Sequence, residues 1–394
     1  MAYWASPVAE KGQMVHRVRS VQLALAGVLC LVTLLGHGRP AVAKGFLESQ
    51  QLAVDEALGR VFAPGHAHDV AEIDARTGRL LRTIALGWTP QTLCLDAQTH
   101  RIYAAGNPAS GAGQGRLGVI DTGSGRLLRT VAVGRDPISI AVDSRAERAF
   151  VVGYGDSELG STGSVTMVDT GRDVAPATLH IADFPRQVVA GARTGHVFVS
   201  DTYSVYMLDA TSGRTLQTLS MIGNEPDAMA LGARTHRVFA TNGSQVSVID
   251  TRSGSVVASP TIVQDSTVSA FAVDERRGWV VVTSYRNADL VGTVSVLDAR
   301  DGRVLRQTAI GDRPLAVAVL PALDRIVTLD VGYGIGDPVQ DVDHLHILQE
   351  TTGRILGGRQ VAGTSLAASA QHGRIIVIGQ ADGAVTVLDG RTWD

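Results

Sequence analysis

The chain has 394 residues, of which 45% are hydrophobic and 19% charged, so it has enough apolar material for a large buried core. Only 5% are aromatic and 44 are glycines, a composition typical of short strands joined by tight turns. The net charge of −3 gives no electrostatic basis for binding nucleic acid or an anionic membrane surface, and we expect neither as a partner.

The first 43 residues have the pattern of an export signal. Basic residues precede an uncharged apolar run, Val21–Leu35, which is too short for an ordinary membrane-spanning helix. The small residues Ala41–Ala43 follow at the spacing that signal peptidase requires. We expect cleavage after Ala43, which leaves residues 44–394 as a single periplasmic or secreted domain. An uncleaved segment is the alternative, and it would be the chain's one membrane contact.

One pattern recurs along the rest of the chain: an apolar strand that ends in Asp, a tight turn that ends in Gly, and a second strand. The strand ends are Ala71–Asp74, Val119–Asp121, Met167–Asp169, Met207–Asp209, Val248–Asp250, Val296–Asp298, Ile347–Gln349 and Val387–Asp389. Successive copies are about 40 to 50 residues apart, the length of a four-stranded propeller blade. An Asp here can accept N–H groups of the turn and a Gly supplies positive φ, so we expect these Asp residues to be structural.

These repeats predict an all-β protein, a β-propeller of four-stranded antiparallel blades. The first three strands of a blade, A to C, occur eight times and the fourth, D, seven times, which favours eight blades. We expect an N-terminal strand around Lys44–Gln50 to supply the missing strand and close the ring, because a propeller must cover its open sheet edges. Seven blades are the alternative, with one terminal unit outside the ring.

Two strand B sequences carry a resemblance to a known family. Arg237–Asn242 is close to the motif that names the YVTN family of β-propellers, and Ile102–Asn107 is a looser copy. The resemblance covers about residues 50–394. It implies the propeller fold but leaves the function open, because the family includes surface-layer, binding and redox-associated propellers, among them relatives of amine dehydrogenase large subunits.

Long connections between strands B and C are the strongest functional feature. Four are long, and all fall on one face: Gly106–Arg116, Tyr154–Ser164, Tyr285–Gly292 and Tyr333–Asp343. Insertions on one face of a repeat array commonly mark its binding face, and the alternative is that they are insertions that the surface merely tolerates. The binding-face candidates are Tyr154, Asp156, Tyr285 and Tyr333. Tyrosine suits a contact surface because it combines apolar area with a polar tip, but each tyrosine packing on the neighbouring blade is an equal alternative.

Two His-x-His pairs suggest a weaker possibility, a metal site. Side chains two residues apart on a strand point the same way, so both imidazoles of a pair can reach one ion. The metal candidates are His66, His68, Asp337, Asp341, Asp343 and His344. The pairs belong to the first and seventh repeats, so a shared site needs loops that reach across the mouth of the ring. The sequence itself requires no cofactor.

We therefore expect a non-catalytic binding or scaffolding module with a protein or small-molecule ligand, and we assign no catalytic residue. The first alternative is a redox-associated propeller, a quinoprotein or amine-dehydrogenase-like subunit, whose turns resemble Asp74–Gly78. The tryptophan that recurs after this turn in quinoprotein repeats is absent here. The second alternative is a metal-dependent lactonase-like hydrolase, but inner strands such as Ala316–Val319 are mostly apolar and offer few ligands.

Overall fold

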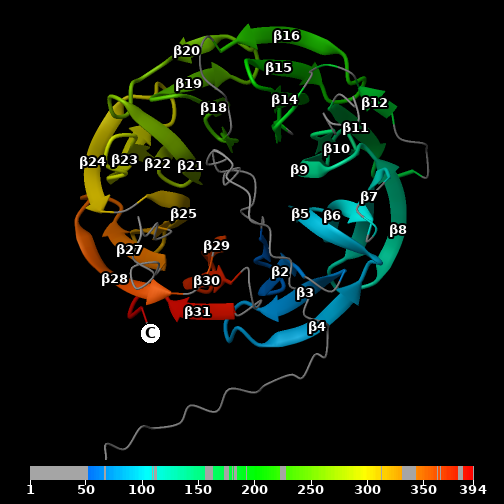
Figure 1. The fold of residues 1–394 in the computed structure, drawn as a ribbon, viewed down its shortest axis with the longest axis horizontal. Coiled ribbons are helices and arrows are strands. Elements are labelled where there is room, and N and C mark those ends of the chain that lie inside the picture. The colour runs from blue at the N-terminus through cyan, green and yellow to red at the C-terminus, as the bar shows by residue number, and fades with distance from the viewer. Residues whose placement is uncertain are drawn as a thin grey trace, which may run out of the picture. The chain divides into compact units, whose positions relative to one another are not determined.

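The computed structural model forms a ring of eight antiparallel sheets, the blades of a propeller (Figure 1). It describes residues 52–65, 68–108, 110, 113–155, 163–172, 177–179, 181, 184–191, 193–221, 228–311, 313–330, 343–361, 363, 365–379 and 385–393. Contacts divide the chain into Met1–Ala43 and Lys44–Asp394, and every described residue belongs to the second unit. The predicted export signal and the predicted closing strand lie outside these residues and stay predictions.

Seven blades run from strand A near the axis to strand D at the rim, and blade 8 has strands A to C among the described residues (Figure 1). Blade 1 contains β1 (Ala53–Asp55), β2 (Arg60–Pro64), β3 (Asp69–Asp74) and β4 (Leu80–Ala85). Blade 2 contains β5 (Trp88–Asp96), β6 (Arg101–Pro108), β7 (Gly115–Asp121) and β8 (Leu127–Val133). Blade 3 contains β9 (Pro137–Asp143), β10 (Arg148–Gly153), β11 (Ser164–Asp169) and β12 (Ala177–Leu179). Blade 4 contains β13 (Gln187–Gly191), β14 (His196–Ser200), β15 (Ser204–Asp209) and β16 (Thr215–Ser220).

The second half of the ring repeats this arrangement. Blade 5 contains β17 (Met229–Gly232), β18 (Arg237–Asn242), β19 (Gln245–Asp250) and β20 (Val256–Ala258). Blade 6 contains β21 (Ser266–Asp274), β22 (Trp279–Arg286), β23 (Gly292–Asp298) and β24 (Val304–Gly311). Blade 7 contains β25 (Pro314–Leu320), β26 (Arg325–Asp330), β27 (Asp343–Gln349) and β28 (Ile355–Val361). Blade 8 contains β29 (Ser365–Ser369), β30 (Arg374–Ile378) and β31 (Val385–Asp389).

Large side chains on strand B fill the joints between blades. The third residue of this strand is aromatic and fully buried in the first five blades: Phe62, Tyr103, Phe150, Phe198 and Phe239. The buried clusters join neighbouring blades, since Phe150 packs with Val199 and Leu208 of blade 4. Burying one such side chain contributes about 2 to 3 kcal/mol, so the stacked blades form one continuous core.

Blade 8 packs directly against blade 1, which closes the ring of described residues. Val61 of β2 shares a buried cluster with Ile376 and Ile378 of β30. The carboxylate of Glu56 accepts hydrogen bonds from the Ser369 hydroxyl at 2.8 Å and from the Ala370 N–H at 2.6 Å. The prediction of eight blades is confirmed, and the seven-blade alternative is wrong because the eighth sheet packs into the ring.

Candidate functional site

The two faces of the ring differ in how regular their connections are. On one face, the strand bounds leave four residues in every A–B turn, such as residues 56–59 between Asp55 and Arg60. The C–D turns on that face have five residues in six of the seven blades with four described strands. On the opposite face, which we call the B–C face, the connections between strands B and C range from two residues in blade 5 to twelve in blade 7. The B–C face therefore varies far more from blade to blade than the regular face does, where a single C–D turn, that of blade 3, differs in length.

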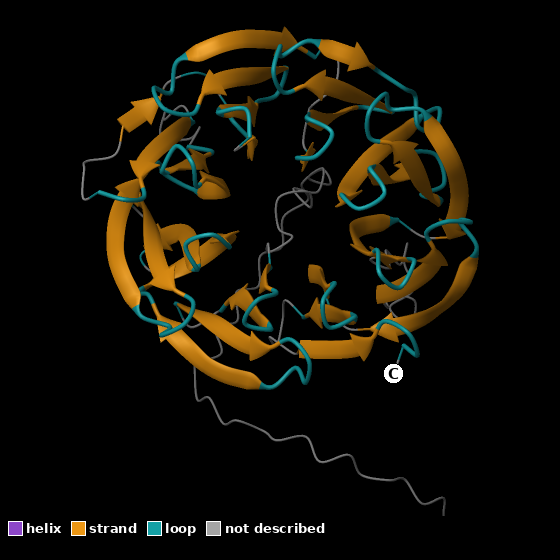
Figure 2. Ribbon diagram, turned by 180° about the vertical axis from the view of Figure 1, so that it is seen from behind, coloured by secondary structure: helices purple, strands orange, loops and turns teal. Residues whose placement is uncertain are grey.

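The regular face is built from repeated turn chemistry. The turns are among the teal segments of Figure 2. The fourth residue of each A–B turn has positive φ, and these residues are Gly59, His100, Glu147, Gly195, His236, Gly278, Asp324 and Gly373. In the C–D turns, Asp74 accepts the Thr77 N–H at 2.7 Å and Asp209 accepts the Ser212 N–H at 2.8 Å. The predicted structural role of these Asp residues is confirmed, because each carboxylate satisfies backbone donors of its own turn.

Arginine and histidine side chains at the start of strand B connect neighbouring blades on this face. Arg101 Nη1 donates to the carbonyl of Thr170 in the next blade at 2.9 Å. His196 Nδ1 lies 2.7 Å from the carbonyl oxygen of Thr251, again one blade further on. Arg237 Nε donates to the carbonyl of Arg300 at 3.0 Å. Residues that repeat on this face therefore connect blades, which leaves the B–C face as the place where blades are free to differ.

Two predicted binding-face tyrosines, at the end of strand B of blades 3 and 6, contact residues of D–A connections. Tyr154 donates its N–H to the Asp136 carbonyl at 2.9 Å, and its ring centroid lies 5.8 Å from that of Phe184. Tyr285 is only 7% exposed, and the Arg313 guanidinium lies 4.6 Å from its ring centroid. Tyr285 therefore packs within the fold, as the alternative interpretation expected. Asp156 and Tyr333 lie outside the described residues.

Tyr203 is an exposed aromatic residue on the B–C face that sequence reasoning missed. It lies in the three-residue connection between β14 and β15 and is 67% exposed. Asp201 fixes this turn: Oδ1 accepts the N–H groups of Tyr203 and Ser204 at 2.8 and 2.7 Å, and Oδ2 accepts the Tyr206 hydroxyl at 2.8 Å. Aromatic side chains on fixed backbone are typical anchors in protein interfaces. A three-residue turn is too short to bury its own tyrosine, and this was the signal in the sequence.

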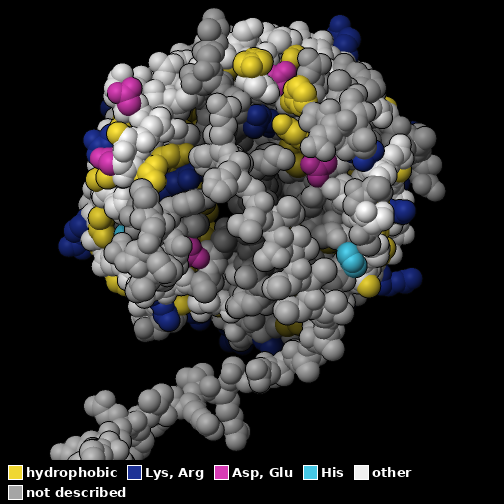
Figure 3. All heavy atoms as spheres, viewed as in Figure 1, with side chains coloured by type: hydrophobic (Ala, Val, Ile, Leu, Met, Phe, Trp, Pro, Cys, Tyr) yellow, Lys and Arg dark blue, Asp and Glu magenta, His cyan; other side chains and the backbone are white. Residues whose placement is uncertain are grey.

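The B–C face carries mixed chemistry. On the face seen in Figure 3, hydrophobic, basic and acidic side chains are interspersed, and the coloured side chains form no field of a single charge. In blade 6 the connection is held by an exposed ion pair in which Arg286 Nη2 lies 2.9 Å from Asp289 Oδ2. Basic and acidic side chains that alternate in this way do not make the clustered basic patch typical of nucleic-acid binding.

The metal candidates do not come together among the described residues. No three His, Cys, Asp or Glu side chains are grouped there so as to hold an ion. His68 Nδ1 lies 2.9 Å from the Thr89 hydroxyl, and Asp343 Oδ2 accepts the Gly363 N–H at 3.0 Å. Beside His344 on β27, His346 Nδ1 lies 2.7 Å from the buried Asp330 Oδ2. His66, Asp337 and Asp341 lie outside the described residues, so the metal site stays a prediction.

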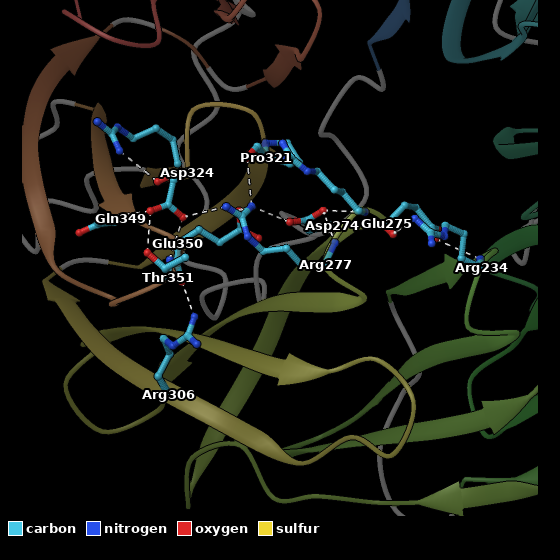
Figure 4. Close-up of polar contacts among 12 residues, drawn as sticks. Arg234, Asp274, Glu275, Arg277, Arg306, Pro321, Asp324, Gln349, Glu350 and Thr351 are labelled. Atoms are coloured by element: carbon cyan, nitrogen blue, oxygen red, sulfur yellow. Dashed lines mark hydrogen bonds and ion pairs between the residues drawn. The ribbon is translucent and has the colours of Figure 1, made fainter.

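A buried charged cluster connects blades 6 and 7 (Figure 4). Arg277 Nη1 lies 2.9 Å from both Asp274 Oδ2 and Glu350 Oε2, and its Nη2 lies 3.2 Å from Asp324 Oδ1. Glu350 is fully buried. Desolvation, reinforced by the negative charge of Asp274, raises the pKa of Glu350 to about 8 despite the nearby Arg277. The cluster lies at the regular face, so we interpret it as structural.

Comparisons with known proteins establish the fold and nothing finer. No family model matches the chain, and no curated protein matches it. BamB from Moraxella catarrhalis is similar, with a TM-score of 0.60 and 14% identity over 86% of this chain and 96% of that one. A chain of the mitotic checkpoint complex gives 0.57 and 13% over 74% and 90%, and Kuenenia stuttgartiensis hydrazine synthase gives 0.56 and 12% over 91% and 100%. Identities this low show a shared propeller architecture.

Within the described ranges, no helix is long and apolar enough to span a membrane. Because no family model matches the chain, the resemblance to the YVTN family rests on the sequence motifs alone. The architecture is that of an eight-bladed propeller, and the candidate site is its B–C face.

Proposed function

We propose that the chain is a non-catalytic binding or scaffolding propeller that takes a protein partner on its B–C face. The observation that carries the proposal is the contrast between the two faces. On one face all A–B turns have four residues and all but one of the C–D turns have five, whereas on the other the B–C connections range from two to twelve residues. Folding requires only the short connections, so the long ones are explained by contacts outside the chain. The exposed Tyr203 supports a protein partner, because it offers a fixed aromatic anchor on the same face.

We further propose that the chain belongs to the YVTN type and works in the periplasm or outside the cell. The first statement rests on the motif at Arg237–Asn242, and the second on the sequence pattern of residues 1–43. Among the similar folds, the name of the mitotic checkpoint complex describes a protein assembly, which agrees with a scaffolding role. Intact-mass spectrometry of protein from the native compartment tests export. A mass that corresponds to residues 44–394 would support it, and the mass of the full chain would count against it.

Site-specific photo-crosslinking tests the binding proposal. A photoreactive phenylalanine derivative replaces Tyr203 on the B–C face or, as the matched control, Leu80 on the outer strand β4, which is 51% exposed. We expect a discrete covalent adduct with one protein from position 203 and none from position 80. Equal adducts at both positions, or none at either, would contradict the proposal. A visible chromophore or stoichiometric metal in the purified protein would favour the redox or hydrolase alternative instead.

A further inference from the structure

The C–D turns of the regular face carry a ring of exposed arginines. Six of these turns have glycine as their fourth residue, and in five of the six the next residue is an exposed arginine: Arg79, Arg126, Arg214, Arg303 and Arg354. The second residue after strand C adds four more, Arg76, Arg252, Arg300 and Arg391, and blade 3 has Arg172 one position later. Every blade therefore presents at least one guanidinium group at this edge of the ring.

The A–B turns of the same face add an inner arc of arginines. In four consecutive blades, 3 to 6, the second residue of this turn is an exposed arginine: Arg145, Arg193, Arg234 and Arg276. Because strand A lies near the axis and strand D at the rim, these turns lie closer to the axis than the C–D turns (Figure 1). Exposed arginines thus follow the whole rim and half of the inner circle.

Few exposed acidic side chains oppose these charges. Among the described residues of the regular face, Glu147 and Asp301 are exposed, against fourteen exposed arginines. On the described part of the B–C face the exposed charges balance, with two arginines and two aspartates: Arg116, Arg286, Asp265 and Asp289. The exposed positive charge of the described residues is therefore concentrated on one face, an asymmetry that the net charge of the chain, −3, conceals.

The aspartates of the C–D turns lie behind the exposed arginines. They are half-buried, and several are paired with an arginine that begins strand B. Arg148 Nη1 lies 2.6 Å from Asp169 Oδ2, and Arg374 Nη1 lies 2.5 Å from Asp389 Oδ2. These strand B arginines are not members of the exposed set. The charge of such a turn Asp is therefore balanced from within the fold, which leaves the exposed arginines in excess.

Exposed aliphatic side chains lie beside the arginines. Leu58, in the A–B turn of blade 1, is 39% exposed. Leu80 and Ile355, each directly after an arginine of the C–D turn, are 51% and 44% exposed. The one exposed large aromatic side chain of the described residues, Tyr203, lies on the opposite face. Aliphatic groups among cations are typical of a surface that docks on lipid, whereas single-stranded nucleic acid is usually held by aromatic stacking.

We propose that the regular face docks on an anionic lipid surface. A guanidinium group matches a lipid phosphate in charge and geometry, and each arginine near such a surface adds to the attraction. Nearly all turns of this face have the same length, so many arginines can meet one extended surface at once. The expectation from net charge, that the chain binds no anionic membrane, does not hold for this face. The B–C face would then point away from the lipid, free to take its own partner.

Vesicle cosedimentation of the whole protein tests the proposal. The vesicles contain phosphatidylcholine alone or equal parts of phosphatidylcholine and phosphatidylglycerol. We expect binding to the anionic vesicles that weakens as sodium chloride is added, because salt screens exposed charges. The triple variant Arg79→Gln, Arg214→Gln and Arg354→Gln should bind them at least about tenfold more weakly than the wild type.

A matched control removes three exposed arginines elsewhere: Arg116→Gln, Arg286→Gln and Arg359→Gln. We expect it to bind the anionic vesicles like the wild type. Residues 1–43 are the same in all three proteins, so a difference between the two triple variants isolates the contribution of the regular face.

Equal binding of the wild type to both kinds of vesicle, binding to neither, or equal loss in both triple variants would overturn the proposal. An oligonucleotide that binds where anionic vesicles do not would also overturn it and would assign the arginines to nucleic acid. Circular dichroism shows whether each variant is folded. If the first variant is not, the salt dependence of the wild type decides, since binding that salt does not weaken would exclude docking through exposed arginines.

Discussion

The buried Glu350 between blades 6 and 7 makes stability depend on pH in a direction that can be calculated. Desolvation first, and then the charge of Asp274, raises the pKa of Glu350 to about 8 from an ordinary value of 4.5. Between these two values the folded state keeps a proton that the unfolded state releases. Stability is therefore greatest below pH 4.5 as far as this group is concerned, and it falls as the pH rises, by about 1.4 kcal/mol per pH unit.

Glu350→Gln removes this titration. From pH 5.5 to 7.5, we expect the free energy of unfolding of the wild type to fall by about 3 kcal/mol relative to that of Glu350→Gln, measured by urea denaturation. Asp324→Asn is the control in the same cluster. Burial opposes ionisation of Asp324, but hydrogen bonds from Thr351 and Gln349 and the charge of Arg277 outweigh it and lower its pKa. The charge of Asp324 also contributes to the raised pKa of Glu350, so the stability of Asp324→Asn should still fall with pH, but less steeply than that of the wild type. A curve for Glu350→Gln that runs parallel to the wild type would refute the reasoning.

Three further predictions concern packing, turn geometry and thiol reactivity. Phe150→Ala should lower the free energy of unfolding by about 3 to 5 kcal/mol in urea denaturation, because the fully buried ring joins blades 3 and 4; a loss below about 1 kcal/mol would contradict this packing. Gly302→Ala should lower the free energy of unfolding by about 1 to 3 kcal/mol in the same assay, because φ is 74° and a Cβ would lie 2.7 Å from Val248 Cγ2. Ala299→Gly in the same turn adds no Cβ and therefore lacks this clash. Desolvation raises the pKa of the Cys94 thiol to about 12, although the residue as a whole is only partly buried. A disulfide reagent at pH 8 should therefore modify Cys94 much more slowly than free cysteine, because the thiolate is the reactive form. Equal rates of modification would contradict this prediction.

The repeat made the ring predictable from the sequence. Turns such as Asp209–Gly213 recur at the same place in each repeat. The hydrogen bonds that form such a turn join residues two or three positions apart, so the turn can be predicted from its own short segment of sequence. The number of blades also followed from counting copies, because each copy became one sheet. Closure near blade 8 was harder to predict, since it depends on contacts such as Glu56 with Ser369, which lie far apart in the chain.

The candidate site was less predictable because exposure is a property of neighbouring blades. Tyr285 begins a long connection, but Arg313 from the next D–A connection covers its ring. Tyr203 lies in a short turn and remains exposed because its three-residue connection cannot fold over it. The ion pairs of Glu72 with Arg60 and Arg82 were not predicted for a similar reason. They join strands B, C and D of blade 1, and the register that brings these three residues together is known only from the structure.

The central claim is that the regular face connects the blades while the B–C face binds a partner, and one measurement tests it directly. Residues 154–163, the long B–C connection of blade 3, are replaced by the two-residue Gly243-Ser244 connection of blade 5, and adduct formation from the photoreactive group at position 203 is measured in the folded variant. We predict an unfolding temperature within a few degrees of the wild type and loss of the adduct, because the connection serves binding rather than folding. An adduct formed in undiminished yield would contradict the claim, as would a shortened chain that no longer folds.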